Sequence, residues 1–144
     1  MCSELLADRP FAEACAAAAG HGYAGIEIAP FTLADDPAAL RGSGAAALRR
    51  VIADAGLRFV GLHWLLAGPG DLHVTHPDPG PRRRSWDLLH RLADLCGELG
   101  GGVMVLGSGR QREARGIPPA QAVGLLREGL LALAPRARAA GATV

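Results

Sequence analysis

The chain has 144 residues, of which 49% are hydrophobic and 20% charged, and its formal net charge is +1. This length suits one ordinary globular domain, and the composition is too apolar for a disordered chain. A net charge so close to zero gives no electrostatic reason to expect nucleic acid or an anionic membrane surface as a partner.

Two further features indicate the compartment. No apolar run approaches the roughly 20 residues that a membrane span needs, and no basic stretch precedes an apolar core and a cleavage site as in a secretory signal. Cys2, Cys15 and Cys96 lie far apart and form no CxxC pair. An odd number of scattered cysteines is typical of a reducing compartment, so we expect buried free thiols and a cytoplasmic protein with no membrane partner.

One pattern recurs four times along the chain: an Ala/Leu-rich helical stretch, one or more glycines, and a short apolar or β-branched run. The four runs contain Ile26, Val60, Val103 and Val144, which are spaced by about 34, 43 and 41 residues. That is the size of a β-strand plus a crossover helix, the repeating unit of a parallel sheet.

The first two predicted helices have recognisable boundaries. The Ala-rich stretch that begins near Glu13 meets Gly20 and Gly22, either of which suits a left-handed helix exit. Residues 36–56 predict a short helical turn followed by a longer helix, because glycines interrupt the segment after its start at Asp36 and Pro37.

The next two predicted helices follow the same rules. Asp78 and Pro79 are typical of a helix cap and first residue, and the helix that they open carries its apolar residues on one side as far as Leu99. The last helix is predicted to begin near Ile117, and Pro135 is expected to kink or break it.

Strand–helix alternation predicts an α/β fold in which helices cover a parallel sheet. This alternation is compatible with both an open doubly wound sheet and a closed (β/α)8 barrel. The nucleotide-binding motifs GxGxxG and GxxxxGK[ST] are absent, and GSGRQREARG at residues 107–116 is a weak phosphate loop. A nucleotide-binding open sheet is therefore the less favoured alternative.

Two strands alternate in a way that indicates a site. In GIEIAPF and VGLHWLL, the apolar residues face one side, and Glu27 and His63 face the other. A carboxylate or an imidazole is costly to bury inside a barrel unless it is paired or takes part in binding or catalysis, so both residues are candidate site residues. The alternatives are an interior ion pair for Glu27 and a neutral core histidine for His63. Trp64 is expected on the side of Leu62, where a core role is favoured over a ligand platform.

Other polar residues give weaker signals. His73 and His76 lie three apart without a further ligand nearby, so ordinary loop histidines are favoured over a metal site. The arginines at residues 82–84 are expected to form a solvated face rather than an anion site. Ser108 and Arg112, after the fourth strand, could hold substrate oxygens or lie in a plain surface turn.

The segments LLADRPFAEACAAAAGHGYAGIEIAPFTL, GLHWLL and VLGSGRQR resemble the sugar phosphate isomerase/epimerase family, whose members are xylose isomerase-like TIM barrels. The resemblance covers essentially the whole chain in order. Leu106 stands where some relatives, the DNA-repair endonucleases, have a histidine, which argues against their multi-metal site. The resemblance implies a partial (β/α)8 barrel of about four βα units with parallel strands, in which residues 1–144 form a single domain that stops before strand five.

The resemblance also implies a chemistry. Full-length members move a proton beside a carbonyl with a divalent metal, manganese, magnesium or cobalt, held by residues near the ends of strands five to eight. We therefore expect no catalytic residue and no metal ligand in residues 1–144, no tightly bound metal, and no isomerase activity of this chain alone. Glu27, His63, Trp64, Ser108 and Arg112 match substrate-binding positions for a sugar or sugar phosphate.

An alternative to an enzyme remains open. A four-stranded section of a barrel leaves sheet edges and an apolar face uncovered, which favours association. The chain could therefore be a half-barrel binding module that associates with further copies of itself.

Overall fold

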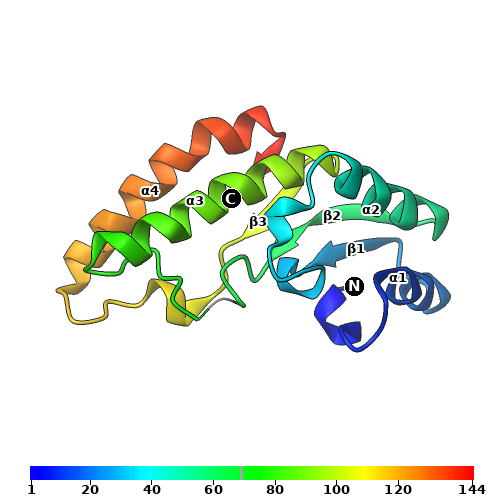
Figure 1. Cartoon of the computed structure of the whole chain (residues 1–144), viewed down its shortest axis with the longest axis horizontal. Coiled ribbons are helices and arrows are strands. Elements are labelled where there is room, and N and C mark those ends of the chain that lie inside the picture. The colour runs from blue at the N-terminus through cyan, green and yellow to red at the C-terminus, as the bar shows by residue number, and fades with distance from the viewer. Residues whose placement is uncertain (69) are drawn as a thin grey trace.

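The structure is a computed structural model that describes residues 1–68 and 70–144. One sheet of four parallel strands, in the order β1-β2-β3-β4, alternates with four α-helices (Figure 1). The elements are η1 (Ser3–Leu6), α1 (Phe11–Gly20), β1 (Gly25–Ile28), η2 (Pro30–Thr32), η3 (Pro37–Ala39), α2 (Ser43–Asp54), β2 (Arg58–His63), α3 (Pro79–Glu98), β3 (Gly102–Val105), η4 (Gly109–Arg112), α4 (Pro119–Ala139) and β4 (Ala142–Thr143).

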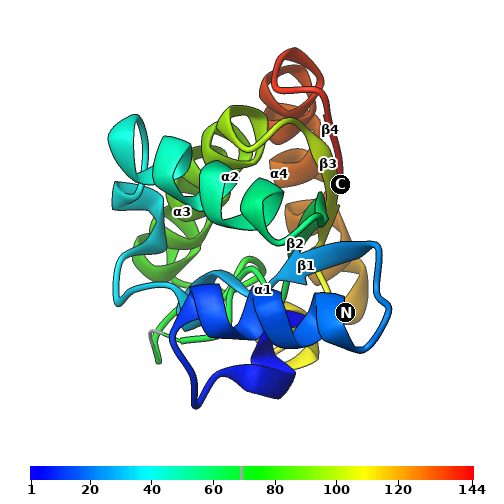
Figure 2. The ribbon, with the colours of Figure 1, turned by 90° about the vertical axis from the view of Figure 1, so that its right-hand side faces the viewer.

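All four α-helices lie on one side of the sheet (Figure 2). The strand residues that face this side, among them Ile26, Ile28, Leu62 and Met104, are almost completely buried against helix residues. Burial of each such side chain stabilises the fold by roughly 1.5–3 kcal/mol. The predicted alternation of apolar strand positions toward covering helices is confirmed.

The opposite side of the sheet is open within the described chain. Val60, Val103 and Val105 face it and remain 40–47% exposed. The register shifts between Ile26 and Glu27, so Val60 is an additional residue on β2. In a closed barrel this side is the packed interior.

The first residues extend the sheet beyond β1. The Met1 amino group donates to the Gly25 carbonyl at 3.2 Å, the Glu27 N–H donates to the Met1 carbonyl at 2.8 Å, and Cys2 forms a parallel bridge with Glu27. The short helix η1 follows at once. The beginning of the chain therefore lies beside β1 as a short further parallel segment.

Most predicted helix boundaries are confirmed. Asp78 caps α3 and accepts a hydrogen bond from the Gly80 N–H at 2.8 Å, and the segment after Asp36 divides into η3 and α2. Gly141 has φ +65°, so the chain leaves α4 through the left-handed region. Of the two expectations for Pro135, a break is wrong, because α4 continues to Ala139, and a kink stays a prediction.

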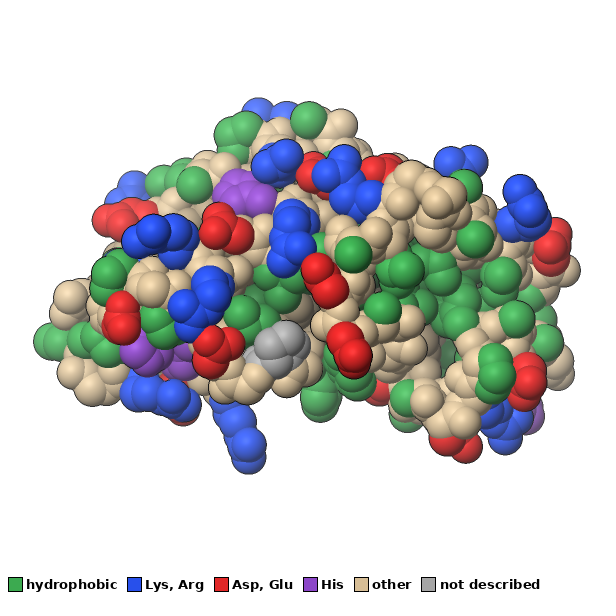
Figure 3. Space-filling view, in the orientation of Figure 1, with side chains coloured by type: hydrophobic (Ala, Val, Ile, Leu, Met, Phe, Trp, Pro, Cys, Tyr) green, Lys and Arg blue, Asp and Glu red, His purple; other side chains and the backbone are tan. Residues whose placement is uncertain are grey.

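The cysteines differ in burial. Cys15 and Cys96 are buried free thiols, whereas Cys2 is half-buried. Acidic and basic side chains are interspersed over the helix-covered face shown in Figure 3. Within residues 1–68 and 70–144, no helix combines the length and the apolarity that a membrane crossing requires.

Candidate functional site

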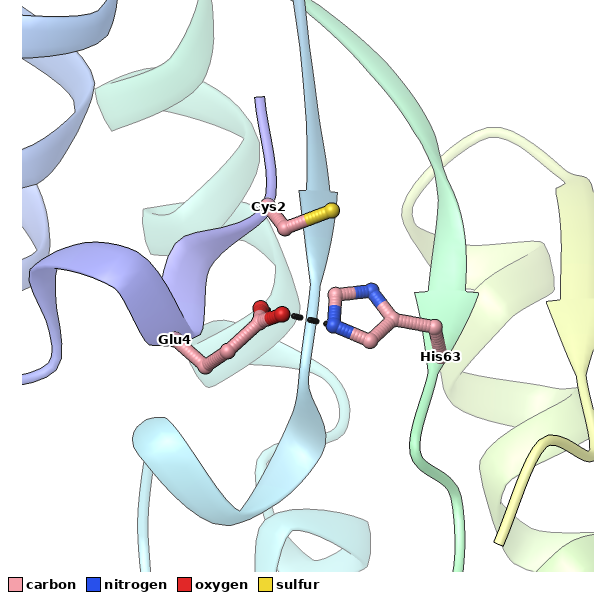
Figure 4. A group of neighbouring side chains, drawn as sticks. All are labelled: Cys2, Glu4 and His63. Atoms are coloured by element: carbon pink, nitrogen blue, oxygen red, sulfur yellow. Dashed lines mark hydrogen bonds and ion pairs between the residues drawn. The ribbon is translucent and has the colours of Figure 1, made fainter.

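Four polar side chains meet where β1 and β2 reach their carboxyl ends. Glu27 lies on β1, His63 ends β2, Cys2 pairs with β1, and Glu4 belongs to η1. We call Cys2, Glu4, Glu27 and His63 the strand-end cluster. Figure 4 shows three of its members, with Glu4 and Cys2 reaching from the beginning of the chain toward His63. In parallel α/β folds the carboxyl ends of the strands are the usual place for a site.

His63 is the centre of the cluster. Its Nε2 lies 2.7 Å from Glu4 Oε2, with which it shares a hydrogen bond, and its Nδ1 lies 3.2 Å from Glu27 Oε2. The second pair is close but not aligned as a hydrogen bond, so Nδ1 is a buried atom without a hydrogen-bond partner in the described structure. The imidazole is therefore held between two carboxylates.

The cluster is shielded from water but open at its rim. His63 is 4% exposed, while about a quarter of each glutamate side chain remains exposed. Cys2 Sγ donates to Glu27 Oε2 at 3.4 Å. Burial, the hydrogen bond to Glu27 and the nearby carboxylate charges raise the pKa of the Cys2 thiol. The arrangement can donate and accept hydrogen bonds, and it offers sulfur, nitrogen and oxygen donors to an ion.

Trp64 departs from the sequence prediction. It follows β2 with a φ of +52° and is 53% exposed, whereas Leu62 is fully buried. The predicted alternation therefore stops at His63, and a core role for Trp64 is wrong. The indole lies 6.4 Å from the Phe31 ring, at an interplanar angle of 43°. Trp64 and Phe31 form an aromatic rim beside the carboxyl end of β2.

Ser108 and Arg112 lie apart from the cluster. Ser108 precedes η4, and its Oγ is buried without a hydrogen-bond partner in the described structure. Arg112 is exposed at the end of η4 and lines an open hollow of about 470 Å³ together with Val105. Within residues 1–68 and 70–144, no hydrogen bond or ion pair joins either residue to His63. Their role in substrate binding stays a prediction.

The weaker candidates take structural roles in their loop. His73 is buried, its ring packs edge-on against that of His76, and burial lowers the pKa of His73. Arg84 pairs with Asp71, and Arg82 donates to the His76 and Pro77 carbonyls. These contacts agree with the prediction that His73 and His76 are ordinary loop histidines rather than metal ligands. They also agree with a mainly solvated face for the arginines at residues 82–84.

Sequence reasoning missed Glu4 and Cys2. Both residues precede the first predicted helix, in a segment for which the sequence analysis above gives no strand or helix. No local pattern in the sequence places Glu4 beside His63, which lies 59 residues further along the chain.

Comparison with known protein families gives the family of the chain. Residues 15–144 match the family described as xylose isomerase-like TIM barrel. The chain belongs to this family. A comparison with curated proteins gives no match.

Solved structures share the fold. The D-psicose 3-epimerase of Clostridium cellulolyticum H10, determined with D-tagatose, has a TM-score of 0.68 and 15% identity, over 93% of this chain and 45% of that one. The D-allulose 3-epimerase of a Methylomonas species, in complex with D-allulose, has a TM-score of 0.63 and 22% identity, over 92% and 43%. The 3-keto-D-glucoside 4-epimerase of E. coli has a TM-score of 0.66 and 15% identity, over 92% and 49%.

These comparisons give the architecture of the chain. It spans less than half the length of each of these three epimerases, and its four parallel strands and four helices match about half of their barrel. Identities this low show the fold alone.

Proposed function

We propose that the chain is a sugar-binding portion of an isomerase/epimerase barrel, and that it supplies the first strand–helix units of that barrel. In this proposal the partly exposed carboxylates of Glu27 and Glu4 bind hydroxyl groups of a sugar or sugar phosphate, His63 holds both carboxylates in place, and Trp64 covers an apolar face of the ring. Ser108 and Arg112 are secondary contacts on the neighbouring loop.

One observation carries the proposal: a buried imidazole lies between two carboxylates at the carboxyl edge of the sheet. Each carboxylate keeps a partly exposed side chain and has spare acceptor positions, which suit sugar hydroxyl donors. The half-exposed Trp64 stands on the same strand end as His63. The epimerase structures, two of which were solved with D-tagatose or D-allulose, support a ketose as the substrate class.

Two of the metals that the family resemblance implies, magnesium and manganese, do not fit these residues. In the described part of the chain, one group of three His, Cys, Asp or Glu residues places its ligand atoms within 4.8 Å of one another, and it consists of Cys2, Glu4 and His63. Magnesium and manganese prefer oxygen ligands, whereas this group includes a thiol. We therefore assign no proton transfer to these residues, and we propose that the isolated chain does not turn over a ketose.

A binding experiment tests the proposal. Saturation-transfer NMR with D-allulose, D-tagatose, D-fructose and L-ribulose is expected to detect contact with at least one ketose. His63→Gln is expected to abolish that signal, whereas His76→Gln, in the loop, is expected to keep it. The proposal fails if no ketose binds the folded chain, or if His63→Gln binds as well as the wild type. Turnover of any ketose by the isolated chain would refute the proposed inactivity.

A second candidate function is a half-barrel that pairs with a second copy of itself. The observation that favours this function is an open groove of about 810 Å³ at the α4–β4 edge. Apolar residues line it, among them Leu126, Leu130, Leu131, Ala142 and Val144. The chain covers 43–49% of each of the three epimerases compared above, so two copies together have about the length of one such barrel.

A further inference from the structure

The strand-end cluster holds more potential negative charge than its hydrogen bonds neutralise. Glu4 and Glu27 contact one imidazole, and the Cys2 thiol donates to Glu27. Partly buried carboxylates without a cation beside them are expensive. If a Zn²⁺ ion bound there and the Cys2 thiol lost its proton to water, the summed formal charge of the two carboxylates, the sulfur and the ion would change from −2 to −1.

The donor atoms of Cys2, Glu4 and His63 are placed for one ion. Cys2 Sγ, a Glu4 oxygen and a His63 ring nitrogen lie within 4.8 Å of one another (Figure 4). Tetrahedral zinc, with bonds of about 2.0–2.3 Å, requires ligand atoms about 3.3–3.7 Å apart. The Glu4–His63 contact of 2.7 Å would have to lengthen by roughly 0.6 Å, which a side-chain movement of the partly exposed Glu4 can supply.

The mixed donor set selects the kind of ion. A thiolate, an imidazole and a carboxylate are the ligands that zinc accepts, whereas calcium and magnesium prefer oxygen alone. Three protein ligands leave the fourth position of a tetrahedral ion open to water or a ligand.

Glu27 supplies the outer contact of such a site. A zinc-bound histidine usually directs its second nitrogen to a carboxylate, which fixes the orientation of the ring. His63 has Nε2 on the Glu4 side and Nδ1 at 3.2 Å from Glu27 Oε2. Nδ1 is buried and lacks an aligned hydrogen bond in the described structure, so a small ring rotation on metal binding would complete this contact.

We propose that Cys2, Glu4 and His63 bind a Zn²⁺ ion, with Glu27 orienting His63 from outside the coordination shell. The site goes beyond the proposed sugar binding. It lies at the ends of the first strands, and ion binding requires neither a sugar nor another part of a barrel.

Titration with zinc alone tests the site. The chain is prepared without an N-terminal tag, because the Met1 amino group contacts Gly25, and it is first dialysed against a chelator. Calorimetry is expected to show one Zn²⁺ per chain. Cys2→Ser and His63→Gln are each expected to weaken binding about 100-fold or more, and Glu27→Gln about 10- to 100-fold. Cys15→Ala and His76→Gln, which alter a thiol and an imidazole elsewhere, are the matched controls and should bind as the wild type does.

A spectroscopic measurement on the unaltered chain keeps the proposal testable if a variant fails to fold. Co²⁺ in place of zinc is expected to give a sulfur-to-cobalt charge-transfer band, and Zn²⁺ is expected to slow alkylation of Cys2. No stoichiometric ion, no charge-transfer band, or unchanged affinity in Cys2→Ser would overturn the site. Because no sugar is present, loss of zinc binding leaves the sugar-binding proposal intact, and loss of sugar binding leaves the zinc site intact.

Discussion

The three thiols lie in different surroundings. Cys15 on α1 and Cys96 on α3 are completely buried among apolar side chains, and burial raises the pKa of each thiol to about 11. Cys2 is half-buried in the strand-end cluster. Since the thiolate is the reactive form, Cys15 and Cys96 behave as small apolar residues of the core.

We expect thiol reagents to distinguish these residues. A pKa near 11 instead of near 9 leaves about 100-fold less thiolate at pH 8, and burial also excludes the reagent. Mass spectrometry after iodoacetamide treatment of the folded chain should therefore find Cys2 alkylated first. Cys15 and Cys96 should react only when urea unfolds the chain, so rapid labelling of either under native conditions would contradict their placement.

The candidate site could be predicted only in part. Glu27 and His63 were identifiable because period-two alternation sends both to the side of the sheet away from the helices. The contact between Glu4 and His63 joins residues 59 apart, and no local pattern encodes that distance. Trp64 was misplaced because its positive φ ends the strand geometry at His63, and a tryptophan carries no signal for such a turn.

At the level of elements, α3 and α4 pack unusually closely. A Cβ atom at Gly129 of α4 would lie 2.0 Å from the Trp86 ring of α3. The Trp86 indole in turn donates to the Val74 carbonyl at 3.2 Å, which fixes the ring. A glycine in the middle of a helix is normally unfavourable, so close packing is the physical reason for it here.

Gly129→Ala is therefore expected to destabilise the fold. The added methyl group overlaps the ring, and such overpacking typically costs about 1–3 kcal/mol, more than the ~1 kcal/mol that alanine gains in helix propensity. Gly124→Ala on the same helix is the matched control, because no atom lies within 4 Å of its added Cβ. Urea denaturation should give a lower free energy of unfolding for Gly129→Ala and an equal or higher one for Gly124→Ala. A rise in both would refute the close packing.

Glu98 joins the end of α3 to the beginning of α2. Its carboxylate accepts from the Gly42 N–H at 2.6 Å and from Arg41 Nε at 2.8 Å. The hydrogen bond from Gly42, followed by that from Arg41, lowers the pKa of Glu98 below its ordinary value of 4.5. Since the folded pKa is the lower one, this stabilisation is fully present above the unfolded pKa and is lost as the pH falls through the folded pKa.

Glu98→Gln should lower the melting temperature at pH 7, and the difference from the wild type should shrink as the pH falls below about 4.5. Circular dichroism melts at several pH values measure this difference. Glu13→Gln, an exposed change on α1, should show no such pH-dependent difference. A constant difference across the pH range would show that the Glu98 charge is not responsible.

The arrangement of elements was more predictable than the site. Caps such as Asp78 and helix exits such as Gly141 are local chemistry, so alternating strands and helices followed from the sequence. The expected break at Pro135 did not occur, because the residues around a helical proline can hold the helix together by packing. Leu133 and Ala137, on either side of Pro135, are buried in the core.

At the scale of the whole molecule, the chain has a covered face and an uncovered one. The helices bury one side of the sheet, whereas Val60, Val103 and Val105 remain exposed on the other. The groove along α4 and β4 adds apolar surface at the last edge of the sheet. In a TIM barrel the parallel strands close into one continuous sheet, so a second copy related by a two-fold axis would cover the β4 edge and the open face of each chain.

We therefore expect the chain to self-associate, and Leu131→Arg to weaken that association. Leu131 is 62% exposed in the groove, so the substitution should leave the fold of one copy intact, while an unpaired charge buried between two copies should weaken dimerisation about tenfold or more. Tyr23→Arg, at a 48% exposed position away from the groove, is the control and should associate as the wild type does. Sedimentation equilibrium over a range of concentrations measures the effect. A wild-type chain that stays monomeric at the highest concentration would show that the open face and the groove are not covered by a second copy.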